Sequence, residues 1–199
     1  MTTPFEYPES PLERRLNPRG YRNPESYRDW LRDEFSFRCT FCLLREKWVP
    51  GGFHLDHFVP RTRSPDRIAD YGNLLYCCGV CNVFKNDTEI PDPTVHLLRG
   101  SIQIDPSGKI IATSHDAALI IESIGLNRPS YQEFRRTWIQ IAECVSIQDS
   151  EIMKLVFGYP SDLPDLTKRR PPGGNLQPEG IVSSHYSRRE RGELPRTYR

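Results

Sequence analysis

Hydrophobic and polar positions follow a regular period over only part of the chain. Near the N-terminus, Asn23, Pro24 and Glu25 suit the cap and the first turn of a helix. The apolar residues that follow recur at helical spacing, namely Tyr27, Trp30, Leu31 and Phe35. The pattern predicts a helix over 23–35 that packs on the segment after it.

A second patterned region lies between residues 53 and 85. Apolar and polar residues alternate over 53–59, which is typical of a half-buried strand. Residues 60–70 are polar and predict a loop. A short apolar segment follows at 74–76, and we expect a helix that runs through Lys85.

The second half of the chain contains a predicted hairpin and predicted helices. Residues 102–111 are apolar at both ends and are interrupted by a turn-forming sequence, Asp105, Pro106, Ser107 and Gly108. Helical patterns lie near 116–125 and 130–147, and a shorter one covers 150–157.

The two ends of the chain show no period. The N-terminal residues are rich in Pro, Arg and Glu and predict an arm. From Tyr159 the chain is rich in Pro, Gly and Arg, which predicts an extended or disordered tail. We therefore expect an arm, a domain with its leading helix, an extension with a hairpin and helices, and a tail, over 1–22, 23–95, 96–158 and 159–199.

Composition limits the class of protein. Of the 199 residues 37% are apolar and 18 are Pro, so a core can form without including the whole chain. The formal net charge is only +1, so any affinity for nucleic acid must come from local basic patches. The sequence has no signal-peptide pattern and no apolar stretch of membrane-spanning length. We expect a cytoplasmic protein with no membrane partner.

Four of the six cysteines form two Cys-x-x-Cys pairs, Cys39 with Cys42 and Cys78 with Cys81. In a reducing compartment such clustered cysteines are metal ligands more often than disulfides. Each pair places two thiolates on one ion, and four thiolates complete the tetrahedral shell of a structural zinc. Cys77 competes with Cys78, but only Cys78 has the two-residue spacing to Cys81.

The remaining two cysteines have other expected places. Cys77 is predicted to point into the core. Cys144 lies alone in an apolar helical pattern, so we expect a buried free thiol there as well.

Between and after the cysteine pairs lie residues with a different chemistry. Asp56 and Asn82 offer hard oxygen ligands of the kind that Mg²⁺ takes. His57 offers a base that titrates near neutrality. On a strand, Asp56 and His57 point to opposite faces, so a bend is needed to direct both at one phosphate.

The order Cys-x-x-Cys, Asp-His-x-x-Pro, Asn-Leu, Cys-x-x-Cys-Asn, Lys over 37–87 resembles the zinc-containing HNH nucleases. The resemblance implies an α+β fold with a ββα-metal core and a structural zinc held by four cysteines, flanked here by helices and an irregular tail. It also implies that Asp56 and Asn82 bind a catalytic Mg²⁺ or Mn²⁺, that His57 is the general base, and that Asn73 ties the loop between the strands.

The family further implies hydrolysis of DNA phosphodiester bonds. One site cuts one strand, so a double-strand break needs a homodimer, two visits or a partner. Small free-standing bacterial members often act beside a partner ATPase or another protein in defence against phage, and the resemblance extends that expectation to this chain.

Basic residues near the motif are candidate phosphate contacts. Arg61 and Arg63 follow the predicted strand, and Lys85 follows the second cysteine pair. The alternative is that these residues bind no ligand. The two arginines would then be ordinary exposed loop residues, and Lys85 would lie on a solvated helix face. His54 shares a strand face with Asp56 and is either close to the metal or a surface histidine.

Two other functions remain open. The first is a zinc-dependent nucleic-acid-binding module that has lost cleavage. The joint presence of Asp56, His57 and Asn82 argues against it. An RNase with the same site is the other, because RNA offers the same phosphodiester bond.

Overall fold

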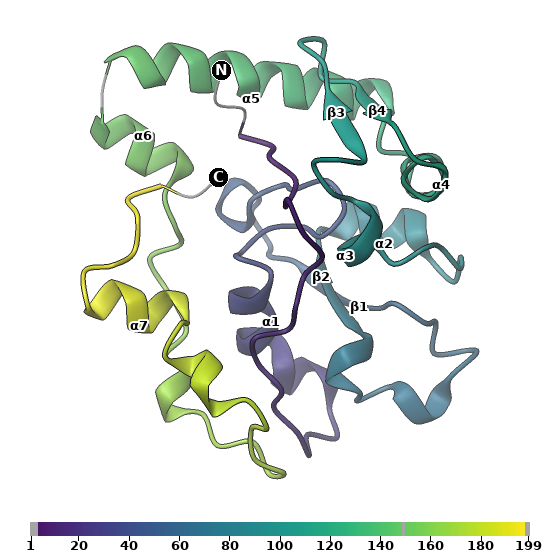
Figure 1. Cartoon of the computed structure of the whole chain (residues 1–199), viewed down its shortest axis with the longest axis vertical. Helices are drawn as coiled ribbons and strands as arrows, with labels where there is room; N and C mark the ends of the chain where they lie inside the picture. The colour runs from purple at the N-terminus through teal and green to yellow at the C-terminus, as the bar shows by residue number, and fades with distance from the viewer. Residues whose placement is uncertain (1–3, 149, 198–199) are drawn as a thin grey trace.

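The computed structural model describes residues 4–148 and 150–197 (Figure 1). The first three residues of the predicted arm and the last two of the predicted tail lie outside the described residues. The fold is mixed α/β, and the strands of the described part form two small antiparallel sheets. No helix in that part combines the length and the apolar character that crossing a membrane requires.

The first sheet and the helix after it form a β-β-α unit. Strand β1 (His54–His57) pairs with β2 (Leu74–Cys77), and helix α2 (Gly79–Lys85) then packs against β1. All four residues of β2 are buried, which agrees with the continuous apolar run in this segment. The predicted strand at 53–59 is therefore present but shorter, because the chain leaves the sheet after His57.

The predicted helix at 23–35 begins as a 3-10 turn (Pro24–Tyr27) and continues as α1 (Arg28–Glu34). The Asn23 side chain accepts a hydrogen bond from the backbone nitrogen of Glu25 at 3.0 Å, as expected of a helix cap. Helix α1 buries its apolar face and contacts β2, so the sequence prediction is confirmed.

The predicted hairpin is also confirmed. Strands β3 (Ile102–Ile104) and β4 (Ile110–Ala112) pair antiparallel. The Asp105 carboxylate accepts hydrogen bonds from the backbone nitrogens of Ser107 and Lys109 at 2.9 and 3.1 Å. Gly108 adopts a φ of +83°, where a side chain is strained, so this turn depends on glycine.

The helices of the second half lie where the periodicity predicts them. They are α4 (His115–Ser123), α5 (Pro129–Gln148) and α6 (Ser150–Phe157), and the short α3 (Pro93–His96) precedes the hairpin. Figure 1 shows α5 along one end of the molecule and α6 on the adjoining flank. The expectation of a buried Cys144 is wrong, because this side chain is exposed. Two positions earlier, Ala142 takes the buried side of the same helix.

Helix α6 is held to the rest of the fold through its C-terminus. The last three carbonyl groups of the helix accept hydrogen bonds of 2.6 to 2.9 Å from the side chains of Arg45, Lys47 and Trp48. Such donors satisfy carbonyls that have no partner inside the helix. The Trp48 ring also stacks on Trp138 of α5 with centroids 4.0 Å apart. The segment around Trp48 therefore joins both helices to the domain.

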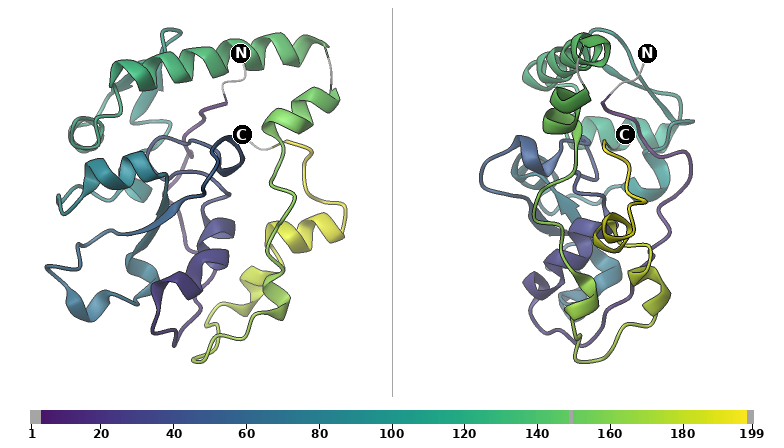
Figure 2. Two further views of the ribbon diagram at one scale, coloured as in Figure 1. Left: turned by 180° about the vertical axis from the view of Figure 1, so that it is seen from behind. Right: turned by 90° about the vertical axis from the view of Figure 1, so that its left-hand side faces the viewer.

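The segment after Tyr159 differs from the extended or disordered tail that its composition predicts. It contains short 3-10 turns and helix α7 (His185–Glu190), and it runs along one flank of the molecule (Figures 1 and 2). Leu163, Leu166 and His185 are buried. These buried residues are isolated in the sequence, so they produce no period, and only the fold shields them from solvent.

One anchor of this segment is the buried carboxylate of Asp33 on α1. It accepts a hydrogen bond of 2.8 Å from the backbone nitrogen of His185 and one of 2.9 Å from the Arg15 guanidinium. Burial alone raises the pKa of Asp33, but the hydrogen bond from His185 and the charge of Arg15 bring this pKa below its ordinary value. The carboxylate therefore stays ionised and holds both the arm and α7.

The neighbouring Glu34 carboxylate fixes the N-terminal arm. It accepts hydrogen bonds from the backbone nitrogens of Arg15 and Leu16 at 2.8 and 3.1 Å, and from the Tyr71 hydroxyl at 2.9 Å. The Glu34 side chain is wholly buried, so these donors replace the water that it loses on folding.

We predict that Glu34→Gln lowers the free energy of unfolding by about 2 kcal/mol, because a buried carboxylate loses charge-assisted hydrogen bonds. Urea denaturation with the metal content held constant measures the change. The control is Glu25→Gln, since Glu25 is half exposed in an ion pair with Arg28. Equal midpoints for the two variants would contradict the proposed role of Glu34 in holding the arm.

Candidate functional site

The first cysteine pair lies in a tight turn before β1. The backbone nitrogen of Leu43 donates to the Cys39 carbonyl at 3.0 Å, and the Cys39 nitrogen donates to the Leu44 carbonyl at 2.9 Å. Leu43 adopts a φ of +58°, a conformation uncommon outside glycine. This reversal brings the side chains of Cys39 and Cys42 to the same side of the turn.

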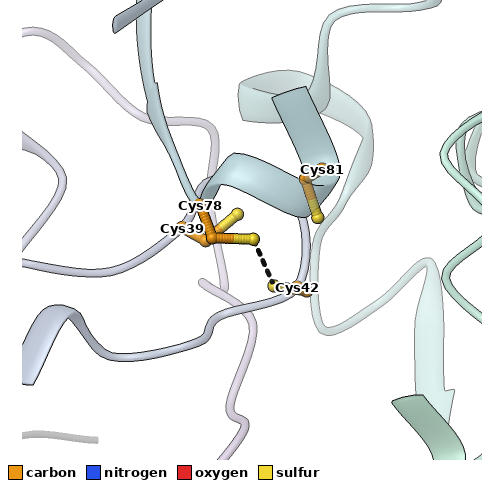
Figure 3. Close-up of side chains that lie close together, drawn as sticks. All are labelled: Cys39, Cys42, Cys78 and Cys81. Carbon is orange, nitrogen blue, oxygen red and sulfur yellow. Dashed lines mark hydrogen bonds between the residues drawn. The ribbon is translucent and has the colours of Figure 1, made fainter. Parts of the chain in front are cut away.

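The second pair lies at the junction of β2 and α2. Cys78 occupies the cap position of α2, and Cys81 lies in its first turn. Residues three apart on a helix share a face, so both sulfurs point in one direction. Figure 3 shows the four sulfur atoms converging from the turn and from the helix start.

The four sulfur atoms of Cys39, Cys42, Cys78 and Cys81 lie within 4.8 Å of one another, and all four residues are buried. The sulfurs of Cys42 and Cys78 are 3.8 Å apart. Tetrahedral coordination with zinc–sulfur bonds of about 2.3 Å requires sulfur separations of roughly 3.8 Å. The cluster can therefore hold a metal ion such as zinc.

The cluster contains Cys78 and excludes Cys77, as the two-residue spacing predicts. Cys77 is buried on the other side of its strand, with its sulfur 3.9 Å from the His54 carbonyl. Successive residues of a strand point to opposite faces, so only one of these neighbours can reach the cluster.

The electrostatics of the cluster favour metal binding. Burial raises the pKa of Cys42 well above that of a free thiol. Hydrogen bonds from Cys39, Cys42 and Cys81 instead lower the pKa of Cys78 far below the ordinary value. The cluster therefore stabilises negative charge on Cys78, and a thiolate is the form of cysteine that binds a metal ion.

A second feature is a polar cavity of about 360 Å³ beside the β-β-α unit. Its lining includes Asp56 and His57 of β1 and Asn82 of α2, the three residues with predicted catalytic chemistry. Strand β1 ends at His57, and the chain turns away at this point. On a regular strand the side chains of Asp56 and His57 would point to opposite faces. Because the strand ends here, both border the same cavity.

The His57 ring is held by the loop between the strands. It is buried, and its Nε2 lies 2.8 Å from the backbone oxygen of Ile68. A carbonyl oxygen can only accept, so Nε2 carries the proton. In neutral imidazole this leaves Nδ1 as the basic nitrogen.

Asp56 is less solvated than an ordinary carboxylate. One carboxylate oxygen accepts a hydrogen bond of 2.8 Å from the backbone nitrogen of His57. The other is buried without a hydrogen bond among the described residues, 3.3 Å from the Lys85 ammonium. Burial raises the pKa of Asp56, and the charge of Lys85 opposes that change. The Asn82 amide, also at the cavity, makes no side-chain hydrogen bond within the described part of the chain.

The predicted phosphate contact of Lys85 is wrong for this structure. The Lys85 side chain is wholly buried, and its ammonium donates to the His57 carbonyl at 2.7 Å. Residues Cys78, Cys81 and Lys85 share the buried face of α2, so the lysine points under β1. Lys85 neutralises Asp56 from inside the protein and has no access to a bound nucleic acid.

Asn73 lies outside the cavity and ties the loop that follows β1. Its side-chain oxygen accepts from the Val59 nitrogen at 2.8 Å, and its amide donates to the Val59 carbonyl at 3.1 Å. A weaker contact of 3.4 Å reaches the Arg67 carbonyl, beside Ile68. This buried asparagine therefore supports the loop whose carbonyl holds His57.

The remaining candidates lie at the surface. Arg61 is exposed and lines the cavity, whereas Arg63 is exposed and forms an ion pair of 2.9 Å with Glu89. His54 is exposed and lies near Gly79, outside the cavity lining. Of the predicted phosphate contacts, Arg61 alone borders the cavity.

Two contacts of the site have no signal in the sequence. The Ile68 carbonyl holds His57, and the Tyr131 hydroxyl lies 3.6 Å from the Cys78 sulfur. A backbone acceptor is independent of residue type, and Tyr131 is 53 positions from Cys78. The path of the loop brings the Ile68 carbonyl to His57, 11 positions away, and the folding of distant segments brings Tyr131 to Cys78.

No protein-family profile matches the chain, and no characterised protein matches it in sequence. The geometry and the residue types of the two adjoining sites therefore carry the functional argument.

We predict that Cys78→Ser loses the bound metal whereas Cys77→Ser retains it, because only Cys78 contributes to the four-sulfur cluster. Elemental analysis of purified protein measures the metal content, with about one ion per chain expected for the parent and for Cys77→Ser. Cys77 is a matched control because it is an adjacent buried cysteine. Equal metal content in both variants would show that Cys78 is no ligand.

Proposed function

We propose that this protein is a metal-dependent endonuclease of the HNH type that hydrolyses DNA phosphodiester bonds. The observation that carries the proposal is the shared cavity of Asp56, His57 and Asn82 on a β-β-α unit. A base and two oxygen donors around one polar cavity are the groups that phosphodiester hydrolysis needs.

We assign the four-cysteine cluster to a structural zinc. The four thiolates would fill the tetrahedral shell of the ion and would leave no position for water or substrate. The ion would join the turn at Cys39 to the start of α2. Its contribution is then to fix α2, which carries Asn82 on its next turn.

The cavity suits a second, catalytic ion. The buried oxygen of Asp56 has the Lys85 ammonium at 3.3 Å as its neighbour, and the Asn82 amide has no side-chain hydrogen bond within the described residues. Oxygen donors of this kind fit Mg²⁺ or Mn²⁺. When bound, the ion supplies positive charge that stabilises the attacked phosphate and the departing oxygen.

His57 has the role of general base. Its Nε2 proton is engaged by the Ile68 carbonyl, so Nδ1 is the nitrogen that takes a proton from water. The same carbonyl stabilises the imidazolium that forms, and Asn73 supports this loop. Arg61 at the cavity rim is placed to contact a neighbouring phosphate.

One observation favours a different function, a zinc-dependent nucleic-acid-binding module without cleavage. The buried Lys85 ammonium already neutralises Asp56, so a catalytic cation has to compete with it. The two functions differ in a measurable property, since only the nuclease requires a divalent ion at Asp56.

We predict that the parent protein nicks supercoiled plasmid with Mg²⁺ or Mn²⁺, and that His57→Ala lowers the rate about a hundredfold or more because the base is lost. Gel electrophoresis of nicked and linear plasmid measures the rate. His54→Ala is the matched control, since His54 lies on the same strand outside the cavity and its loss should leave the rate unchanged.

Other results of this experiment identify the alternatives. Cleavage confined to RNA offered in parallel would replace the DNA assignment and keep the mechanism. Binding without cleavage of any substrate would establish the binding module. Equal rates for His57→Ala and the parent would exclude His57 as the base.

We predict that Lys85→Met strengthens Mn²⁺ binding to the zinc-loaded protein by about tenfold or more, because the variant removes a cation that competes for Asp56. Isothermal titration measures the affinity, and Lys109→Met, an exposed lysine elsewhere, is the control. Unchanged or weaker Mn²⁺ binding would argue against Asp56 as a ligand of the ion.

A further inference from the structure

The first turns of α5 lie against the cysteine cluster. The Tyr131 hydroxyl is 3.6 Å from the sulfur of Cys78. A tyrosine hydroxyl is protonated at neutral pH, and a thiolate is a hydrogen-bond acceptor. With Cys78 as a thiolate ligand, the Tyr131 hydroxyl would be the donor of this contact, although the two residues are 53 positions apart in the sequence.

One helical turn after Tyr131, Arg135 is almost completely buried. Its Nε donates to the Gly108 carbonyl at 2.5 Å, and one terminal nitrogen donates to the Leu126 carbonyl at 2.8 Å. The other terminal nitrogen is buried without a hydrogen bond in the described residues. Arg135 also has no carboxylate partner there, so its charge lacks the usual compensation.

The metal centre offers that compensation. Four thiolates outweigh the charge of a divalent ion, so a loaded centre is a buried anion. Burial lowers the pKa of Arg135, and Tyr7 and Cys42 oppose that change, so Cys42 as a metal-bound thiolate would stabilise the guanidinium charge. An uncompensated buried cation and a buried anion in one region stabilise each other.

A further contact joins the start of α5 to helix α2. Arg128, just before α5, has its guanidinium 3.7 Å from the ring centroid of Phe84 and 4.4 Å from that of Tyr131. Such stacking of a cation on aromatic rings is favourable. The start of α5 thus contacts both the ligand Cys78 and the helix that carries it.

We propose that Tyr131 and Arg135 form the outer shell of the metal centre, so that metal binding and the docking of α5 on α2 stabilise each other. The proposal rests on the structural metal site assigned above. Groups that hydrogen-bond to metal ligands raise the affinity and orient the ligands. Because the coupling is reciprocal, a loaded centre also holds the extension, residues 96–158, in place.

The test uses Co²⁺ in place of zinc, because its absorption reports on the sulfur ligands. Tyr131→Phe removes only the hydroxyl. We expect about tenfold weaker Co²⁺ binding in competition with a chelator, and a sulfur-to-cobalt absorption band at longer wavelength. The shift follows because a sulfur without its hydrogen bond gives up an electron more readily. Tyr186→Phe on α7 is the matched control and should change neither quantity.

Two arginine variants separate charge from structure. Arg135→Lys keeps the positive charge and Arg135→Met removes it, while both lose the planar donor arrangement. We expect Arg135→Met to bind Co²⁺ about tenfold more weakly than Arg135→Lys. In all loaded variants, amide hydrogen exchange along α5 should rise with the loss of affinity.

The outcomes identify which idea fails. If the parent binds neither Co²⁺ nor zinc, the metal centre itself is wrong. If the parent binds and Tyr131→Phe keeps the parental band and affinity, the outer shell is wrong and the centre stands. A folded Tyr131→Phe with reduced stability but an unchanged spectrum would assign Tyr131 to packing alone and would also overturn the proposal.

Discussion

The meeting of four buried sulfur atoms is the contact on which this structure depends. It joins the turn at Cys39 and Cys42 to the start of α2. Helix α2 has only seven residues, and so short a helix is unstable in water unless tertiary contacts hold it. Four thiols in one buried place satisfy each other poorly without a cation. A metal ion held by this cluster would therefore also fix the position of α2.

Helix α2 transmits that constraint to the polar cavity. Cys81 of the cluster and Asn82 of the cavity lining are adjacent residues of this helix, so one element positions both sites. Lys85 then fixes the end of β1 by its contacts with Asp56 and the His57 carbonyl. In the proposed nuclease, this one short helix would serve both the proposed structural metal site and the proposed catalytic site.

Buried charges hold the irregular parts of the chain to this core. Asp33 and Glu34 bind the N-terminal arm and α7 through backbone and guanidinium donors. Arg135 links the hairpin at Gly108 to α5 beside the cluster. A buried charge is costly unless its partners are complete, so each one fixes the geometry of the segments around it.

The sequence by itself determined the features that depend on local spacing. These are the helix after Asn23, the glycine turn of the hairpin, the choice of Cys78 over Cys77, and the residue types of the candidate site. Only the tertiary structure decided that Lys85 is buried, that Cys144 is exposed and that the segment after Tyr159 packs on α1. Local spacing specifies periods and turns, whereas the burial of a side chain is set by segments far away in the sequence. For the same reason Tyr131, which contacts Cys78, had no sequence signal, and the Ile68 carbonyl that holds His57 had none because a backbone acceptor is independent of residue type.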